Sequence, residues 1–356
     1  VGIAAHDFVQ AFGAPEVVLT RAARQEGVPT VPSRWLLRLD TVLRAAGLDH
    51  ALRPDETVKA AAEQIDEPEH YRPLPPATPR PPLAARPRRL SVTQIEIWLR
   101  DPYAIYARHI LELKPLDELD ADPGRADLGI AIHGALDEFV HRYPRALPAE
   151  AEAELLEIGL AHFGPILSRP GAWAFWWPRF ERIAHWLIAE ERGHRSRVVE
   201  SISESEGSLT LPAPGGPFTL TAKADRIDRL AAGGFLLVDY KTGSLPSKTE
   251  IGAGFAPQLP LEGAILRDGS FASATGVPAA LEYWRLTGGV PVGERKVLSD
   301  DDPNKLIQSV LDRVKALIDR FDDPETPYLV EPVPRWAPRF SDYRHLERVA
   351  AREDEE

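Results

Sequence analysis

The sequence predicts an α/β fold in which a small mixed β-sheet is flanked by helices. The clearest amphipathic helix covers 303–321, where apolar residues recur at three- and four-residue spacing. Two strands are expected at 218–229 and 235–240, and the Ala-Ala-Gly-Gly between them predicts a hairpin. A helix near 256–267 and a strand at 280–286 follow, so strand and helix signals alternate in this half of the chain.

The composition is that of a globular protein. The chain has 356 residues, of which 44% are hydrophobic and 27% charged, and we expect one large or two unequal domains. The net charge of −12 argues weakly against indiscriminate binding to polyanions but says little about a local groove. No apolar run has the length of a membrane span. The lack of cysteine excludes disulfides, a thiolate nucleophile and a Cys-ligated zinc or iron–sulfur centre.

Changes in composition divide the chain into four segments. Residues 1–70 form a small mixed segment, with a short buried strand expected at 16–22 and a helix that starts after an N-capping Ser33. Residues 71–90 are rich in proline and arginine, which predicts an extended basic linker. Residues 91–345 hold the main domain and 346–356 a charged tail. The chain opens inside an apolar segment, so we expect it to be part of a longer protein.

The main domain is expected to begin with helices. Ser91-Val92-Thr93-Gln94 is a capping box that predicts a helix start, and Asp101-Pro102 interrupts that helix. Strand signals take over at 198–204, ahead of the hairpin. Between these points we expect three more helices, at 127–143, near 149–167 and near 178–197.

Acidic and basic side chains gather at the predicted hairpin. Asp239 and Lys241 end its second strand, and they project to the same side because strand side chains alternate. Asp225 lies on the partner strand. Two carboxylates and an ammonium at one sheet edge suit a divalent cation and a bound water, which together can cut a phosphodiester. The Asp-Tyr-Lys triplet alone is weak evidence, and the nearby Asp228 more simply pairs with a strand arginine.

Two further candidates lie on helices. His133 is flanked by small residues in Gly129-Ile130-Ala131-Ile132-His133-Gly134, so a sheet edge or a ligand can approach it closely. Asp137, one turn on, offers this histidine an ordinary ion-pair partner, and a lone helical histidine is usually structural. Gln258 begins the helix that follows Lys241 and by itself carries almost no information.

Together these four elements resemble the RecB-like branch of the PD-(D/E)XK nuclease superfamily. The shared pattern is a helical Gly-x-x-x-His, an Asp before a hairpin, an Asp-x-Lys at the end of the next strand, and a Gln-bearing helix after it. The resemblance spans about residues 91–290. It implies a restriction-endonuclease-like core and a metal-dependent DNA nuclease.

The roles of the family's residues carry over by position. The resemblance implies that Lys241 positions or helps deprotonate the attacking water, or acts purely as an electrostatic clamp. Gln258 would orient the site or touch the DNA backbone, so the implied catalytic group comprises Asp225, Asp239, Lys241 and Gln258. The implied ligands of Mg²⁺ or Mn²⁺ are the side chains of His133, Asp225 and Asp239 and the backbone carbonyl of Tyr240.

The flanking segments resemble the C-terminal part of the AddB proteins of AddAB helicase–nucleases. Val17 to Ala22 and Pro32 to Leu36 are similar to the end of a degenerate helicase domain. This resemblance implies single-stranded DNA as substrate and an AddA-type helicase–nuclease as the partner in a heterodimer. It also implies double-strand break resection in the bacterial cytoplasm, at the nucleoid.

The chain departs from these relatives in two places. Some AddB proteins hold an iron–sulfur cluster through four cysteines, one of them before the Pro-Tyr that here follows Asp101, and a chain without cysteine cannot do so. Relatives often carry Tyr where this chain has Glu262. The chain also has no G-x-x-x-x-G-K-[ST] loop, so we expect neither binding nor hydrolysis of ATP.

Two other interpretations of the same residues stay open. One is a non-catalytic module that keeps the nuclease fold to guide DNA or to brace a partner. The other is a stand-alone RecB-like exonuclease of the Cas4 kind, although its usual cysteines are absent. Under the nuclease interpretation, the candidate contacts to the DNA backbone are Arg86, Arg88, Arg89, Arg100 and Arg108.

Overall fold

A computed structural model describes residues 2–25, 28–52, 56–67, 75–116, 123–167, 169–268, 271–298 and 302–348. The chain divides into two compact units, Val1–Pro73 and Leu74–Glu356. The predicted boundary between the first segment and the linker falls among residues 68–74, which lie outside the described part of the chain.

The first unit is small and open to solvent. Its elements are α1 (Gly2–Ala11), the short antiparallel pair β1 (Arg24–Gln25) and β2 (Val28–Pro29), α2 (Arg34–Ala45), a 3₁₀ turn at Asp49–Leu52 and α3 (Glu56–Asp66). Ser33 caps α2 as predicted, since its hydroxyl accepts a hydrogen bond of 3.3 Å from the backbone N–H of Leu36. In α1 and α2 no residue is buried.

The prediction of a strand at 16–22 is wrong. Residues 17–22 have no regular structure and are mostly exposed. Among the described residues of this unit, strand pairing is confined to β1 and β2. An apolar segment that finds no neighbouring strand leaves its backbone groups to water, so β-propensity alone does not make it a strand.

The second unit is built on a six-stranded mixed sheet. β5 pairs antiparallel with β4 and β6, while β7 runs parallel to β6 and antiparallel to β8. The main path through the sheet is β3-β5-β6-β7-β8, and β4 pairs with β5 off this path. The strands are β3 (Arg89–Ser91), β4 (Val198–Leu211), β5 (Phe218–Leu230), β6 (Phe235–Lys241), β7 (Pro278–Leu286) and β8 (Gly293–Val297).

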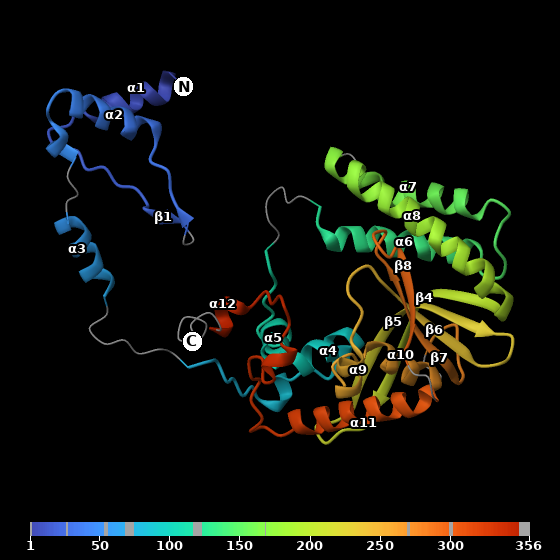
Figure 1. Ribbon diagram of the computed structural model, residues 1–356. Helices are drawn as coiled ribbons and strands as arrows, with labels where there is room; N and C mark the ends of the chain where they lie inside the picture. Colours follow the sequence, from blue (N-terminus) through green and yellow to red (C-terminus); the bar gives the residue numbers. More distant parts are fainter. Residues whose placement is uncertain are drawn as a thin grey trace. The chain divides into compact units, whose positions relative to one another are not determined.

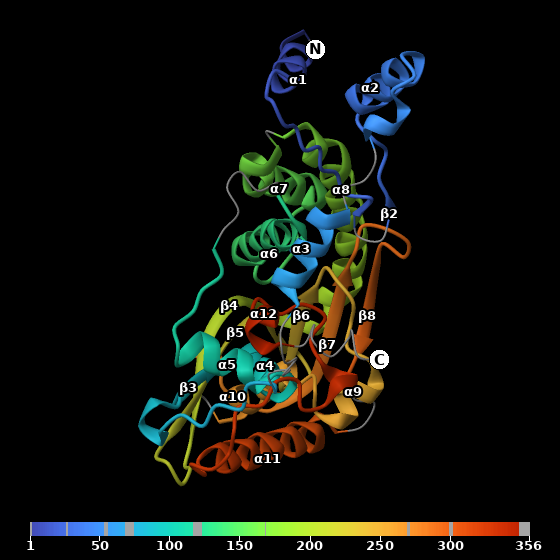
Figure 2. The same cartoon turned by 90° about the vertical axis from the view of Figure 1, so that its left-hand side faces the viewer.

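Helices cover both faces of this sheet (Figures 1 and 2). One core packs α6 (Arg125–Arg142), α7 (Ala151–Leu167) and α8 (Pro170–His194) against Leu236, Val238 and Tyr240 of β6. The other core packs α4 (Val92–Arg100), α10 (Gln258–Arg267) and α11 (Pro303–Phe321) against Leu237 and its neighbours. This arrangement confirms the predicted class, a small mixed sheet flanked by helices.

The start of the main domain follows the predicted pattern. Ser91 and Gln94 form the capping box of α4 in both directions, with hydrogen bonds of 3.2 Å and 2.8 Å between side chain and backbone. α5 (Pro102–His109) restarts after Asp101, and α6 begins close to the predicted residue. The short helix α9 (Lys248–Ala253) after the sheet edge was not predicted.

Residues 75–90, the described part of the proline- and arginine-rich segment, pack as part of the second unit. A 3₁₀ turn at Leu83–Ala85 leads into β3, which pairs in parallel with residues 219–221 of β5. The Arg86 side chain is 4% exposed, and its guanidinium donates to the carbonyls of Phe321, Asp323 and Pro324. This burial argues against the expected contact of Arg86 with DNA, because its guanidinium already donates to backbone carbonyls of the protein.

The described part of the second unit finishes with a short helix, α12 (Arg344–Glu347). Glu347 is buried, although it falls in the segment predicted as a charged tail, and residues 349–356 of that tail lie outside the described part. Within the described ranges, no helix combines the length and the apolar character needed to cross a bilayer.

Candidate metal centre and active site

Two predicted site residues, Asp239 and Lys241, lie next to each other on strand β6. Its even-numbered residues Leu236, Val238 and Tyr240 enter the core under α6–α8, so Asp239 and Lys241 face the opposite way. The Lys241 Nζ lies 2.9 Å from Asp239 Oδ2. Asp239 is almost completely buried, which makes this ammonium its principal countercharge.

Gln258, the first residue of α10, joins this pair. Its Nε2 donates to Asp239 Oδ1 at 2.6 Å, and its Oε1 accepts from Lys241 Nζ at 2.9 Å. The amide therefore bridges the acid and the amine and fixes their relative orientation. The structure brings together Asp239, Lys241 and Gln258, which lie on two elements and were predicted as one group.

Asp225 and His133 meet on the other side of Tyr240. The backbone N–H of Tyr240 donates to Asp225 Oδ2 at 2.8 Å, which ties the middle of β5 to the end of β6. His133 Nδ1 lies 3.4 Å from Asp225 Oδ1. The His133 ring also stands edge-on to the Tyr240 ring, with 6.1 Å between centroids.

Small residues on α6 allow this approach. A Cβ on Gly129 would lie 3.4 Å from the Thr242 hydroxyl, just after β6, so the helix runs close to the sheet edge. A Cβ on Gly134 would come within 2.6 Å of His162 Nδ1 on α7. Asp137, the alternative partner considered for His133, instead accepts a hydrogen bond of 2.6 Å from Ser203. The glycines of this segment thus position His133 over the strands.

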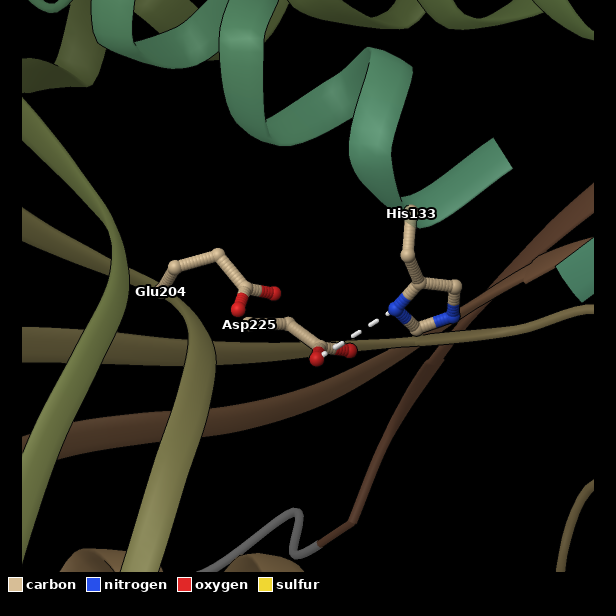
Figure 3. A group of neighbouring side chains, drawn as sticks. All are labelled: His133, Glu204 and Asp225. Atoms are coloured by element: carbon tan, nitrogen blue, oxygen red, sulfur yellow. Dashed lines mark ion pairs between the residues drawn. The ribbon is translucent and has the colours of Figure 1, made fainter. Parts of the chain in front are cut away.

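A third carboxylate, which sequence reasoning missed, belongs to the same cluster. Glu204 of β4 lies opposite Asp225, between the register pairs Ser203↔Arg226 and Ser205↔Ala224. Potential ligand atoms of His133, Glu204 and Asp225 all lie within 4.8 Å of one another (Figure 3). Glu204 also forms an ion pair with Lys223 and has a left-handed backbone, with φ at 50°. Glu204 and Asp225 are neighbours because of the register in which β4 and β5 pair, and this register cannot be read from the sequence.

The electrostatics of the cluster favour a positive charge among its acids. Burial raises the pKa of Asp239 to about 6, although Lys241 opposes the shift. Burial alone would lower the pKa of His133, but the hydrogen bond to Asp225 and the charges of Asp225 and Asp239 together outweigh it and raise the pKa. The pKa of Lys241 is likewise raised, because Asp239 outweighs the effect of burial. Lys241 is therefore an ammonium near neutral pH.

Glu262 sits one turn beyond Gln258 and is 1% exposed. Burial, together with the charges of Asp239 and Asp225, raises the pKa of Glu262 well above its usual range. Gln258 Nε2 donates to its Oε1 at 3.2 Å. A carboxyl group that stays protonated can donate a hydrogen bond. In this respect it resembles the hydroxyl of the tyrosine that relatives often carry at this position.

The remaining predicted arginines differ in how free they are. Arg88 pairs with Asp322 and with the carbonyl of Gly216. Arg100 is bound to Glu96, Glu250 and the carbonyl of Phe255, and little of it faces solvent. Arg89 and Arg108 are exposed. Of the predicted set, these last two therefore remain the candidates for direct contact with a polyanion.

Arg108 lines a groove of about 750 Å³ between α4–α5 and the C-terminal segment 335–343. Arg335 and Arg339 also line it, together with Trp336 and the 91% exposed Phe340. Glu96 also lines the groove, and burial raises its pKa against the opposing charges of Arg100 and Lys241. Basic and aromatic side chains therefore lie together along this hollow.

The fold and the cluster define a class of protein that sequence comparison identifies independently. A family model for the PD-(D/E)XK nuclease superfamily matches residues 89–332. The chain belongs to the PD-(D/E)XK nuclease superfamily, as its resemblance to that family predicted. The carboxylates of the cluster fit the divalent cation that this family generally uses, since carboxylate oxygens suit Mg²⁺ and Mn²⁺.

The relatives cover different shares of the chain. An uncharacterized protein of Rickettsia bellii is 30% identical over 185 residues, which make up 52% of this chain and 22% of that protein. The uncharacterized protein RC0550 of Rickettsia conorii is 26% identical over 263 residues, 72% of this chain and 30% of that one. A component of the ATP-dependent helicase/deoxyribonuclease of Lacticaseibacillus casei is 25% identical over 187 residues, 45% and 16% respectively.

These relatives are much longer than the part that matches. The chain spans less than a third of the length of each, with coverages of 22%, 30% and 16%. A solved structure, the crystal structure of SSO0001, is similar over 72% of this chain and 82% of that one, with 11% identity and a TM-score of 0.26.

Proposed function

We propose that this chain is a metal-dependent deoxyribonuclease that hydrolyses phosphodiester bonds. The observation that carries the proposal is the meeting of His133, Asp225, Asp239 and Lys241 around the end of β6. Membership of the PD-(D/E)XK nuclease superfamily supports the same chemistry. Two acids, a histidine and an amine that converge from β5, β6 and α6 are costly to maintain without a function.

The residues have distinct roles in this proposal. His133, Asp225, Asp239 and the carbonyl of Tyr240 would hold Mg²⁺ or Mn²⁺. Such an ion lowers the pKa of a water and offsets negative charge on the phosphate. Lys241 stays charged and stabilises the phosphate or the attacking water by its hydrogen bonds, rather than taking up a proton. Gln258 keeps Lys241 beside Asp239.

We propose single-stranded DNA as the substrate. The groove beside α4 and α5 supports this choice, because arginines can follow a phosphate backbone while the exposed ring of Phe340 offers a flat face to unpaired bases. Such binding depends on counterion release and weakens steeply with salt. Arg108, Arg335 and Arg339 would supply the cations.

We further propose that the chain acts with an AddA-type helicase–nuclease partner in double-strand break resection, in the bacterial cytoplasm. Similarity to a component of a protein named ATP-dependent helicase/deoxyribonuclease supports this assignment. In this proposal residues 1–70 are the end of a helicase-like domain, residues 91–345 are the nuclease, and the two belong to a longer protein.

The test is cleavage of end-labelled single-stranded DNA with Mg²⁺ or Mn²⁺ and with EDTA. We expect Lys241→Ala to lose about 10²- to 10³-fold in rate, the range for removing one electrostatic donor from a transition state. Lys248→Ala, an exposed lysine on the neighbouring α9, is the control and should retain activity. If the wild-type chain with an AddA-type partner cuts nothing under any of these conditions, the protein is a non-catalytic module instead.

A further inference from the structure

Glu204 brings an additional carboxylate to the place where Asp225 meets His133. It lies directly opposite Asp225 in the β4–β5 register, and both carboxylates point toward the imidazole (Figure 3). Like charges opposite one another on neighbouring strands are unfavourable. Together with the imidazole nitrogen, these groups are a donor set for a divalent cation such as Mn²⁺.

The cation that faces Glu204 is Lys223. Lys223 lies two residues before Asp225 on β5, and its ammonium forms an ion pair with Glu204. More than half of the lysine side chain is exposed, at 57%, whereas Glu204 is 23% exposed. An ion pair with so exposed a partner holds the lysine only weakly. The ammonium can therefore leave when a stronger cation competes.

The cluster is also open to solvent. His133, Glu204 and Lys223 line a hollow of about 510 Å³, whose wall on the α6 side includes Gly129 and Gly134. A hydrated ion can thus reach the imidazole and the Glu204 carboxylate without any movement of the backbone. The same hollow gives Lys223 room to turn away.

We propose that Glu204 is a further ligand of the divalent cation that His133 and Asp225 would hold. Before the cation binds, Lys223 forms an ion pair with the Glu204 carboxylate. This inference rests on the proposed metal-dependent function and extends its ligand set. Lys223 also lines a second hollow of about 530 Å³, with Arg89 and Thr221. When the cation displaces Lys223, the Lys223 ammonium and the Arg89 guanidinium can contact the same phosphate of the DNA backbone from this second hollow.

The test measures Mn²⁺ binding by calorimetry in the absence of DNA. We expect Glu204→Gln to weaken binding at least about tenfold, since even partners outside the coordination sphere contribute that much. Lys223→Gln should bind Mn²⁺ several-fold more tightly, because the competing ammonium is gone. Glu206→Gln is the matched control, as it removes the same charge from the next position on that side of β4, opposite Lys223. Thermal unfolding in EDTA verifies that each variant is folded.

The outcomes separate this inference from the proposed function. Asp225→Asn serves as the reference, because it removes a ligand of the centre itself. If Asp225→Asn abolishes binding while Glu204→Gln matches the wild type, Glu204 is not a ligand and only this inference fails. If the wild type binds no Mn²⁺, the metal centre fails as well. Equal weakening by Glu204→Gln and Glu206→Gln, or unchanged affinity in Lys223→Gln, also overturns the inference.

Discussion

The side chain of Asp228 is a place where a single charge change should cost this fold much of its stability. Asp228 is fully buried, and its Oδ1 accepts from Arg226 Nε at 2.7 Å while its Oδ2 lies 2.6 Å from His194 Nε2. Arg226 is buried too, and it also pairs with Glu191. The prediction from sequence that Asp228 is structural and pairs with a strand arginine is confirmed. In Asp228→Asn the guanidinium would lose one of its two countercharges inside the protein.

The size of the effect follows from that burial. Removing one partner of a buried ion pair costs about 3–5 kcal/mol, because the remaining charge stays desolvated. In Asp228→Asn, Glu191 still neutralises part of the Arg226 charge. We therefore expect the free energy of unfolding to fall by about 3 kcal/mol, the lower end of that range. This is a large share of the roughly 5–15 kcal/mol by which domains are typically stable.

The free energy of unfolding, measured by urea titration at pH 7, checks this expectation. Glu200→Gln is the matched control, since Glu200 pairs with the exposed Arg145 and Arg229 and should cost at most about 1 kcal/mol. Burial would raise the pKa of Asp228, but the charge of Arg226 and the hydrogen bonds from Arg226, His194 and Ser201 outweigh it and lower the pKa strongly. The stabilisation by this carboxylate is therefore complete above the ordinary carboxyl range and disappears only in strong acid. A loss in Asp228→Asn no greater than that in Glu200→Gln would refute the reasoning.

Two further predictions concern the C-terminal segment and the groove. Burial and the neighbouring Glu347 raise the pKa of Asp101 from 3.8 to about 8, so this acid destabilises the fold increasingly as the pH rises from about 4 to 8. The melting temperature of Asp101→Asn should therefore exceed that of the wild type by more at pH 8 than at pH 4.5, and an equal difference at both pH values would contradict this. Phe340→Ala should weaken binding of a single-stranded oligonucleotide by roughly 5- to 100-fold, as the loss of one stacked base does, while Phe175→Ala, which removes another exposed ring on α8, should not. Fluorescence anisotropy at two salt concentrations measures this, and equal affinities of the two variants would exclude stacking in the groove.

Local sequence patterns predicted the part of the site that local geometry determines. Asp239 and Lys241 share a face because strand side chains alternate, and this needs only two residues of spacing. The capping box at Ser91 is likewise a short-range arrangement, and both of its hydrogen bonds are present. The placement of Gln258 beside Lys241 came from the resemblance to a family rather than from any physical pattern in the chain.

The features that sequence analysis missed depend on contacts between distant residues. Glu204 faces Asp225 only because β4 and β5 pair in one register, and shifting a strand by one residue reverses every side chain. Arg86 is buried because the carbonyls at the end of α11 come to it from more than two hundred residues away. Composition predicted a basic linker there, and composition does not show which carbonyls lack donors.

Tyr240 of strand β6 connects the helical layer α6–α8 to the acidic cluster. The Tyr240 ring is held among α6–α8, where its hydroxyl accepts a hydrogen bond of 3.2 Å from Arg226, while its backbone N–H holds Asp225. We therefore expect a change in the packing of α8 to alter the geometry of the Asp225–His133 pair without touching either residue. Variants that weaken cation binding should accordingly be sought among buried residues of the helical layer as well as among the acids themselves.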